Sequence, residues 1–168
     1  MITLLALVFA AATQASGPIG EEGRTDGFYV AQLAVPDVDG LEREWAVPGE
    51  GVNVTGTSEL VRNKATFTTI SFGGCTKDAA GRCRITVAYQ IFAPDGSYYG
   101  GRESSERATA FDGPMSDPAQ MYLGGAYMGV RIEPGEALGK YRIRATTTDE
   151  IGHKTVVTER VLTAVEAK

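Results

Sequence analysis

The alternation of apolar and polar residues is clearest in the last third of the chain. Between residues 140 and 145, Tyr141 and Ile143 are among the apolar positions, and basic side chains separate them. This period of two is typical of a half-buried β-strand. Residues 149–153 break the pattern with a turn, and a β-branched run returns at 155–158. The pattern predicts a β-hairpin and favours an antiparallel sandwich.

Five further segments carry strand patterns. The most regular one begins at Cys83 and alternates up to Ile91, so we expect it to be a central strand of the core. Turn-forming residues such as those at 94–97 recur at the spacing of a sandwich. Together with the hairpin, these segments give seven or eight strands. The five segments are residues 28–35, 51–61, 65–72, 83–91 and 121–133.

Three glycines, Gly124, Gly125 and Gly129, interrupt the strand predicted at 121–133. Glycines inside strands mark bulges or a close approach of the backbone to another group. We expect that they curve the sheet, with a ligand surface as the alternative.

The segment from Gly100 to Gln120 is long and polar, with two prolines. A loop of this length is uncommon in a small domain and is more often functional or disordered than an ordinary connection. We therefore expect it to bind a partner, together with the aromatic residues beside it. The candidate binding residues are Tyr98, Tyr99, Arg102, Glu103, Phe111, Asp112, Asp117 and Tyr122.

The two cysteines, Cys75 and Cys83, are separated by seven residues. In an exported chain such a pair most simply forms one disulfide, which would clamp a hairpin. Between them, Asp78 can start a turn and Gly81 can close it in the left-handed conformation. The bridge would stabilise the fold by about 2 to 3 kcal/mol on the chain-entropy account. The alternative is a redox or metal pair, but the spacing is not C-x-x-C.

The first 20 residues carry no charged side chain, and apart from one threonine residues 2–12 are apolar. This is typical of a secretory signal peptide, so we expect residues 1–15 to be removed after Ala15, with Ala12 as the second choice. The usual basic residue after Met1 is missing, so either the amino group alone supplies the positive end or the true start lies upstream. Residues 16–27 then form a flexible lead-in, and residues 28–168 form a single sandwich domain.

The charge pattern bears on partners and compartment. The net charge is −5 with a pI near 4.9, and Lys and Arg are scattered among Asp and Glu. Binding to nucleic acid or to an anionic membrane needs a basic face, so both are disfavoured. No second long apolar segment follows the first, so we expect no transmembrane segment in the mature chain. The expected location is the periplasm, or otherwise the extracellular medium.

A proline, glycines and a leucine precede Tyr141 at the start of a late strand, which resembles the tyrosine corner of immunoglobulin-like and fibronectin type III sandwiches. With the segments at 72–100 and 131–149 and the secretion signal, the chain resembles exported bacterial proteins that carry such a domain and have no assigned activity. The resemblance implies an all-β, antiparallel immunoglobulin-like sandwich of seven to eight strands. It also implies that Tyr141 is structural, and it transfers no catalytic residue.

A few other residues could carry chemistry, but their sequence context favours structural roles. The acidic residues Asp37, Asp39 and Glu42 suggest calcium, but the glycine comes at the wrong position for an EF-hand loop, and we expect a turn and a short helix-like stretch instead. Trp45, which follows, is expected to fill the core. The only histidine, His153, lies in the hairpin turn, where it is poorly placed for a catalytic triad or a zinc site, so we expect no metal and no cofactor.

The leading hypothesis is therefore a noncatalytic exported module that binds a protein or envelope component through the 100–120 loop or an exposed strand edge. The first alternative is a carbohydrate-binding domain, with the aromatic faces of Tyr98, Tyr99, Phe111 and Tyr122. The second is a small hydrolase that uses paired carboxylates. The carboxylates for that alternative are Asp95, Glu103, Glu106, Asp112 and Asp117.

Overall fold

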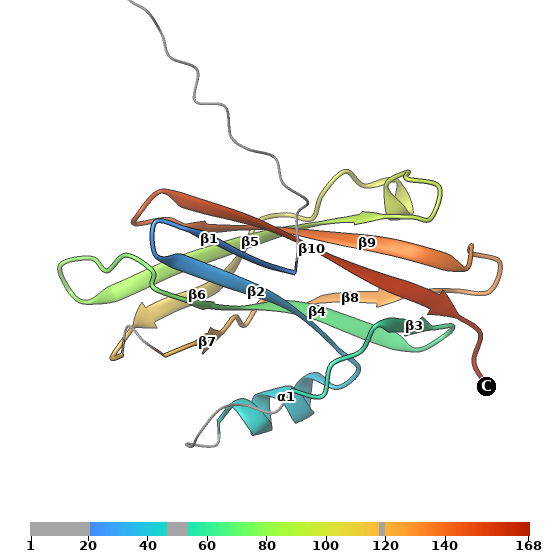
Figure 1. Ribbon diagram of the computed structural model, residues 1–168, viewed down its shortest axis with the longest axis horizontal. Coiled ribbons are helices and arrows are strands. Elements are labelled where there is room, and N and C mark those ends of the chain that lie inside the picture. The colour runs from blue at the N-terminus through green and yellow to red at the C-terminus, as the bar shows by residue number, and fades with distance from the viewer. Residues whose placement is uncertain (1–20, 47–53, 118–119) are drawn as a thin grey trace, which may run out of the picture.

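The computed structural model describes residues 21–46, 54–117 and 120–168. The predicted signal peptide at 1–15 lies outside these residues, and so do positions 16–20 of the predicted lead-in. The described residues form two five-stranded β-sheets and one α-helix (Figure 1). The all-β sandwich predicted from the alternation is therefore confirmed.

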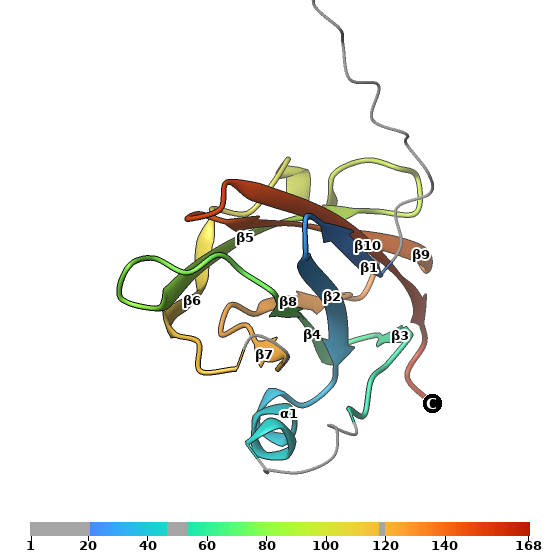
Figure 2. The same cartoon turned by 60° about the vertical axis from the view of Figure 1, so that its left-hand side comes forward.

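The two sheets lie one over the other, and helix α1 (Val38–Trp45) lies on the side of the first sheet (Figure 2). The first sheet has the order β1-β2-β4-β7, and β8 pairs with the same edge of β4 as β7 does. Its strands are β1 (Glu22–Thr25), β2 (Phe28–Val35), β4 (Ala65–Gly73), β7 (Tyr122–Leu123) and β8 (Met128–Arg131).

The second sheet has the order β3-β10-β9-β5-β6. The order β10-β9-β5 matches the G-F-C sheet of an immunoglobulin-like sandwich. All pairs in both sheets are antiparallel except β3 with β10, which is parallel. The strands are β3 (Glu59–Val61), β5 (Arg82–Phe92), β6 (Ala108–Pro114), β9 (Gly139–Asp149) and β10 (Lys154–Val165).

The core lies between the sheets and follows the predicted alternation. In β9 and β10 the inward side chains are buried in turn, and the hairpin pairs from Asp149 with Lys154 to Gly139 with Ala164. Tyr141 is buried, and its hydroxyl donates a hydrogen bond to the Ala137 carbonyl at 2.8 Å. The largest buried side chains include Phe28, Leu60, Ile70, Phe72, Ile85, Ile132, Ile143 and Leu162.

Four features differ from the sequence-based expectations. Strand β1 occupies residues 22–25 of the predicted lead-in, because the turn at Asp26 and Gly27 lets this segment fold back on β2. Strand β6 divides the loop predicted at 100–120. Trp45 is half-buried and does not fill the core, because α1 buries only Leu41. The described residues contain ten strands, whereas the sequence predicted seven or eight. The prediction was too low because four of the strands have four residues or fewer, which is too short to leave a clear pattern in the sequence.

The predicted disulfide is present between Cys75 and Cys83. It does not clamp a hairpin within one sheet, because it spans the crossover from β4 in the first sheet to β5 in the second. Asp78 accepts hydrogen bonds from the N–H groups of Ala80 and Arg82 within this crossover. Disulfides persist in oxidising environments, so the bond indicates a compartment outside the cytoplasm. Within the described ranges, no helix is long and apolar enough to cross a membrane.

Candidate functional site

The predicted 100–120 loop is two separate segments in the structure. Between them β6 pairs with β5, and Ala110 and Met115 are buried in the core. The sequence did not show this strand because Gly113 and Pro114 end it and an irregularity shifts its register beside Ile85 and Thr86. The binding surface must therefore be sought in each segment separately.

The first segment, residues 99–106, leaves β5 and then returns to it. The N–H of Ser105 donates to the Tyr89 carbonyl at 2.7 Å, and the Ser105 hydroxyl accepts from the Tyr89 N–H at 2.8 Å. Between this loop, β5 and β8 lies a hollow of about 500 Å³. The side chains of Tyr89, Ile91, Tyr99 and Met128 provide its apolar surface, and this volume falls within the range of sites that hold small-molecule ligands.

The two tyrosines of the hollow are held in place by hydrogen bonds. The Tyr99 hydroxyl lies 2.8 Å from the Arg131 carbonyl and 2.9 Å from a carboxylate oxygen of Glu136, so it can donate to either. Burial, together with Glu136, raises the pKa of Tyr99 to about 12. The Tyr89 hydroxyl donates to the Ala126 carbonyl at 3.2 Å, and burial raises its pKa. Both rings are therefore neutral, fixed walls at ordinary pH.

Two side chains of opposite charge, Arg102 and Glu106, stand at the exposed rim of the hollow. Neither forms an ion pair with any other side chain in the described part of the chain. Pairing them with ligand groups would therefore cost no existing salt bridge. The arrangement suits a ligand with an apolar group for the floor and polar or charged groups for the rim.

The four aromatic side chains proposed for carbohydrate do not form one platform. Tyr98 packs on Phe92, with ring centroids 5.2 Å apart, on the outer face of the second sheet. Tyr99 meets Tyr141 edge to face at 5.7 Å. Phe111 and Tyr122 instead pack with each other at 5.6 Å and share contacts with the buried ring of Phe72.

Two of the carboxylates proposed for hydrolysis, Asp112 and Asp95, already have hydrogen-bond or ion-pair partners. Asp112 forms ion pairs with Arg82 at 2.9 Å and with Arg84 at 3.3 Å, and the Arg82 hydrogen bond in particular lowers its pKa. Hydrogen bonds from Ser97 lower the pKa of Asp95. A general acid of a glycosidase needs a raised pKa, so these two shifts have the wrong sign.

The remaining candidates divide between the two segments, with Glu103 and Glu106 in the first and Asp117 in the second. Glu103 is exposed on the loop at the hollow, whereas the backbone N–H of Asp117 donates to the Tyr122 hydroxyl at 3.3 Å in the second segment. The structure therefore brings Tyr99 and Arg102 to the hollow and leaves Tyr98, Phe111, Asp112, Asp117 and Tyr122 elsewhere.

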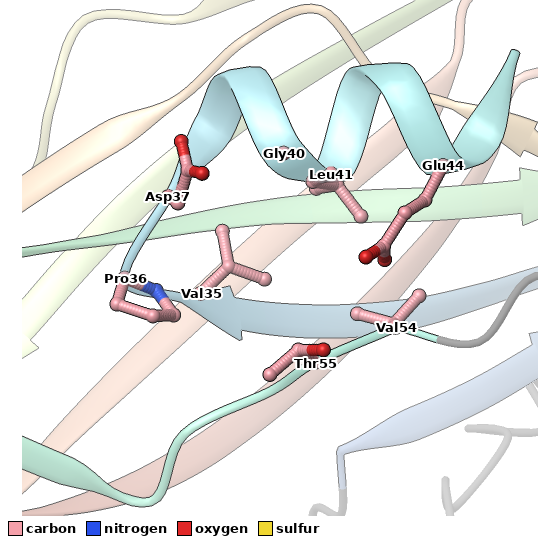
Figure 3. Close-up of a pocket in the computed structure, with 8 residues that line it drawn as sticks. All are labelled: Val35, Pro36, Asp37, Gly40, Leu41, Glu44, Val54 and Thr55. Atoms are coloured by element: carbon pink, nitrogen blue, oxygen red, sulfur yellow. The ribbon is translucent and has the colours of Figure 1, made fainter.

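A second, smaller hollow of about 230 Å³ lies under α1. Figure 3 shows Leu41 and Glu44 pointing from the helix toward the end of β2 and Val54. Asp37 lines the same hollow and lies 3.7 Å from Arg43. The calcium alternative for Asp37, Asp39 and Glu42 finds no support: among the described residues, no three His, Cys, Asp or Glu side chains form a group that could hold a metal ion.

The sequence alone did not indicate three members of the larger hollow. Tyr89 belonged to the predicted central strand, and Met128 and Gly129 to the predicted strand at 121–133, so their alternation assigned them to the sheet. Of these three, only Gly129 carried a signal, as one of the three glycines for which a ligand surface was the alternative to sheet curvature. Contact between β5, β8 and the 99–106 loop is tertiary and has no sequence motif.

No family model matches the chain, and no curated protein matches its sequence. Among solved structures, the CARDB domain of the PF1109 protein from Pyrococcus furiosus, in complex with di-metal ions, is similar at 18% identity and a TM-score of 0.39, over 66% of this chain and 83% of that one. The soluble domain of PmoD from Methylocystis sp. ATCC 49242 (Rockwell) is similar at 10% identity and a TM-score of 0.36, over 89% of this chain and 100% of that one. Neither likeness carries an argument about function.

Proposed function

We propose that the protein is an exported, noncatalytic binding module of the bacterial cell envelope, and that it binds a protein or envelope component at the hollow between the 99–106 loop and β8. One observation carries the proposal: an apolar hollow of about 500 Å³ has at its rim two opposite charges, Arg102 and Glu106, that form no ion pair within the described residues. Sites of this kind combine an apolar lining with a few polar groups that orient the ligand. The Cys75–Cys83 bond supports the exported location.

The chemistry of the described residues supports a noncatalytic role. His153 is exposed in the β9–β10 turn, with φ at 52°, and no carboxylate of the described residues pairs with its side chain. Asp112, the best-placed carboxylate of the predicted loop, is already paired with two arginines. A nucleophile and its base need to lie within hydrogen-bond reach of each other, and the hollow offers no such pair among its lining residues.

The test must not remove β6, because Ala110 and Met115 belong to the core. Deletion of residues 100–120 would therefore unfold the domain and say nothing about binding. The rim double variant Arg102→Ala/Glu106→Ala changes only exposed side chains without ion pairs. A matched control is Lys77→Ala/Glu59→Ala, which removes one exposed charge of each sign away from the hollow.

The experiment is affinity capture from envelope extracts with the disulfide-bonded protein, read by mass spectrometry. We expect the wild type and the control to enrich the same component and the rim double variant to lose most of it. Equal enrichment by all three proteins would show that the hollow is not the site. If no component is enriched by the wild type, the binding role itself is contradicted.

A further inference from the structure

Strand β8 forms an edge of the first sheet and borders the hollow. Of the described strands, it pairs with β4 alone, from Ala65 with Arg131 to Thr68 with Met128. On its other side Met128 and Gly129 line the hollow. A strand that pairs on one side only presents a row of backbone N–H and C=O groups on the other.

Two hydrogen bonds show which backbone groups of β8 point outward. The Ile132 carbonyl accepts from the N–H of Asn63, which precedes β4, so Ile132 faces β4. The Arg131 carbonyl accepts from the Tyr99 hydroxyl on the opposite side. Because successive residues of a strand alternate in direction, the N–H and C=O of Gly129 also point away from β4. No group in the described part of the chain bonds to them on that side.

We infer that the open edge of β8 binds an extended segment of a partner protein, which adds a strand there and places one apolar side chain in the hollow. This inference rests on the proposed function and names its ligand class. In strand addition, the backbone hydrogen bonds provide affinity and the pockets for alternate side chains provide specificity. Gly129 supplies the unpaired N–H and C=O, while Tyr89, Ile91 and Met128 supply the pocket.

Two properties of the edge favour a polypeptide over a small molecule. Soluble proteins protect open edges by keeping them very short, or with charged side chains, proline, a bulge or a covering loop. Strand β8 is short, with four residues, but it contains neither proline nor lysine. In β8, Gly129 and Arg131 are exposed, and the Arg131 side chain turns back to donate to the Asn63 carbonyl at 3.1 Å. A small molecule could fill the hollow but would leave the outward groups of Gly129 to water, whereas an extended chain satisfies both.

The charges of the rim agree with this geometry. Arg102 and Glu106 lie four residues apart on the loop that faces the edge, and neither forms an ion pair with another of the described residues. In a polypeptide, the residues that flank the one in the hollow can be acidic on one side and basic on the other, and so can pair with Arg102 and Glu106. We therefore expect partner segments with an apolar residue flanked by acidic and basic residues.

Position 129 offers a matched pair of variants. Gly129→Pro removes the outward N–H, and proline is accepted on edge strands whose N–H faces outward. Gly129→Ala keeps this N–H. Both variants add a Cβ, which would lie 3.3 Å from Cε1 of the Phe67 ring, so both require the same small shift of that ring. The two variants share the added Cβ, so the difference between them reports the loss of the outward N–H together with the proline ring that replaces it.

The probe is a phage-displayed library of linear peptides, selected on the full-length disulfide-bonded chain. For an enriched peptide we expect Gly129→Pro to weaken the Kd about tenfold, since one backbone hydrogen bond is lost, and Gly129→Ala to change it less than about threefold. N-methylation along the peptide should abolish binding at every second residue, because alternate N–H groups of an added strand face β8. This second measurement does not depend on the folding of the Gly129→Pro variant.

The inference is overturned if the library yields no enriched peptide, if N-methylation shows no period of two, or if Gly129→Pro binds as the wild type does. It is also overturned if the chain dimerises in solution and Gly129→Pro abolishes the dimer, because a second copy then occupies the edge. If the rim double variant loses the captured envelope component but the peptide tests fail, the proposed binding function is supported and binding by strand addition is contradicted. If N-methylation shows the expected period of two but Arg102→Ala/Glu106→Ala does not change the Kd of the peptides, strand addition is supported and the role of the rim charges is contradicted.

Discussion

The side-chain carboxylate of Asp149 accepts a hydrogen bond from the backbone N–H of Thr76 at 2.7 Å. It also accepts from the N–H groups of Ile151 and Gly152, at 3.2 and 3.0 Å. Asp149 is fully buried at the end of β9. One carboxylate therefore ties the β9–β10 turn to the crossover that the disulfide closes, two segments about 70 residues apart in the chain.

Replacement of this carboxylate should destabilise the fold strongly. In Asp149→Ala the three backbone donors lose their acceptor, so we expect the free energy of unfolding to fall by about 2 to 4 kcal/mol. Urea unfolding followed by circular dichroism measures this change. Asp39→Ala, an exposed residue of α1, is the control and should change the free energy by less than about 0.5 kcal/mol. A comparable change in both variants would contradict the role of Asp149.

The disulfide should contribute measurably to stability although its ring is short. Loss of the Cys75–Cys83 bond frees a loop of about nine residues in the unfolded chain, which corresponds to about 2 to 3 kcal/mol. We expect a reducing agent to lower the melting temperature of the wild type. The double variant Cys75→Ala/Cys83→Ala should melt lower from the start and should not respond to the reducing agent. A response of this variant would show that the agent acts elsewhere.

The sequence predicted the elements whose side chains alternate without interruption. Strands β5 and β9 follow the pattern closely, because one face of each is buried against the first sheet. The adjacent pair Glu159 and Arg160 required that one of them point inward, and it is Arg160 that does so. Its partners, the Glu21 carboxylate at 2.7 Å and the Gln32 carbonyl at 3.3 Å, lie more than 120 residues away in sequence, so no local pattern could identify them.

The site was only partly predictable for the same reason. Tyr98 and Tyr99 are neighbours in sequence, yet one packs on the outer face of the second sheet and the other faces the hollow. Their separation follows from the bridge between Tyr98 and Phe92 and from the hydrogen bond of Tyr99 to β8. Both depend on contacts between strands, which composition and spacing do not show.

The tyrosine corner should contribute a single hydrogen bond. In Tyr141→Phe the ring stays buried and only the bond to the Ala137 carbonyl is lost. We expect the free energy of unfolding to fall by about 1 kcal/mol, since water can still reach the exposed Ala137. Tyr98→Phe is the matched control, because the Tyr98 hydroxyl has no hydrogen-bond partner in the described part of the chain. Chemical unfolding measures the free energy of unfolding of both variants. An equal decrease in Tyr141→Phe and Tyr98→Phe would show that the hydrogen bond of Tyr141 does not stabilise the fold.

The last prediction concerns alkaline pH and the wall of the hollow. Burial first, and then the Glu136 carboxylate, raise the pKa of Tyr99 to about 12, compared with about 10 in an unfolded chain. The stability that neutral Tyr99 contributes is therefore complete below about pH 10 and is lost as the pH rises through 12. Glu136→Gln removes the negative charge beside the hydroxyl, so the pKa of Tyr99 should fall, although burial keeps it above its ordinary value. The ultraviolet absorption of tyrosinate, with the spectrum of Tyr99→Phe subtracted, reports this titration. A wild-type transition near pH 10, or no shift in Glu136→Gln, would show that Tyr99 is not held against Glu136 and that the hollow is not preformed.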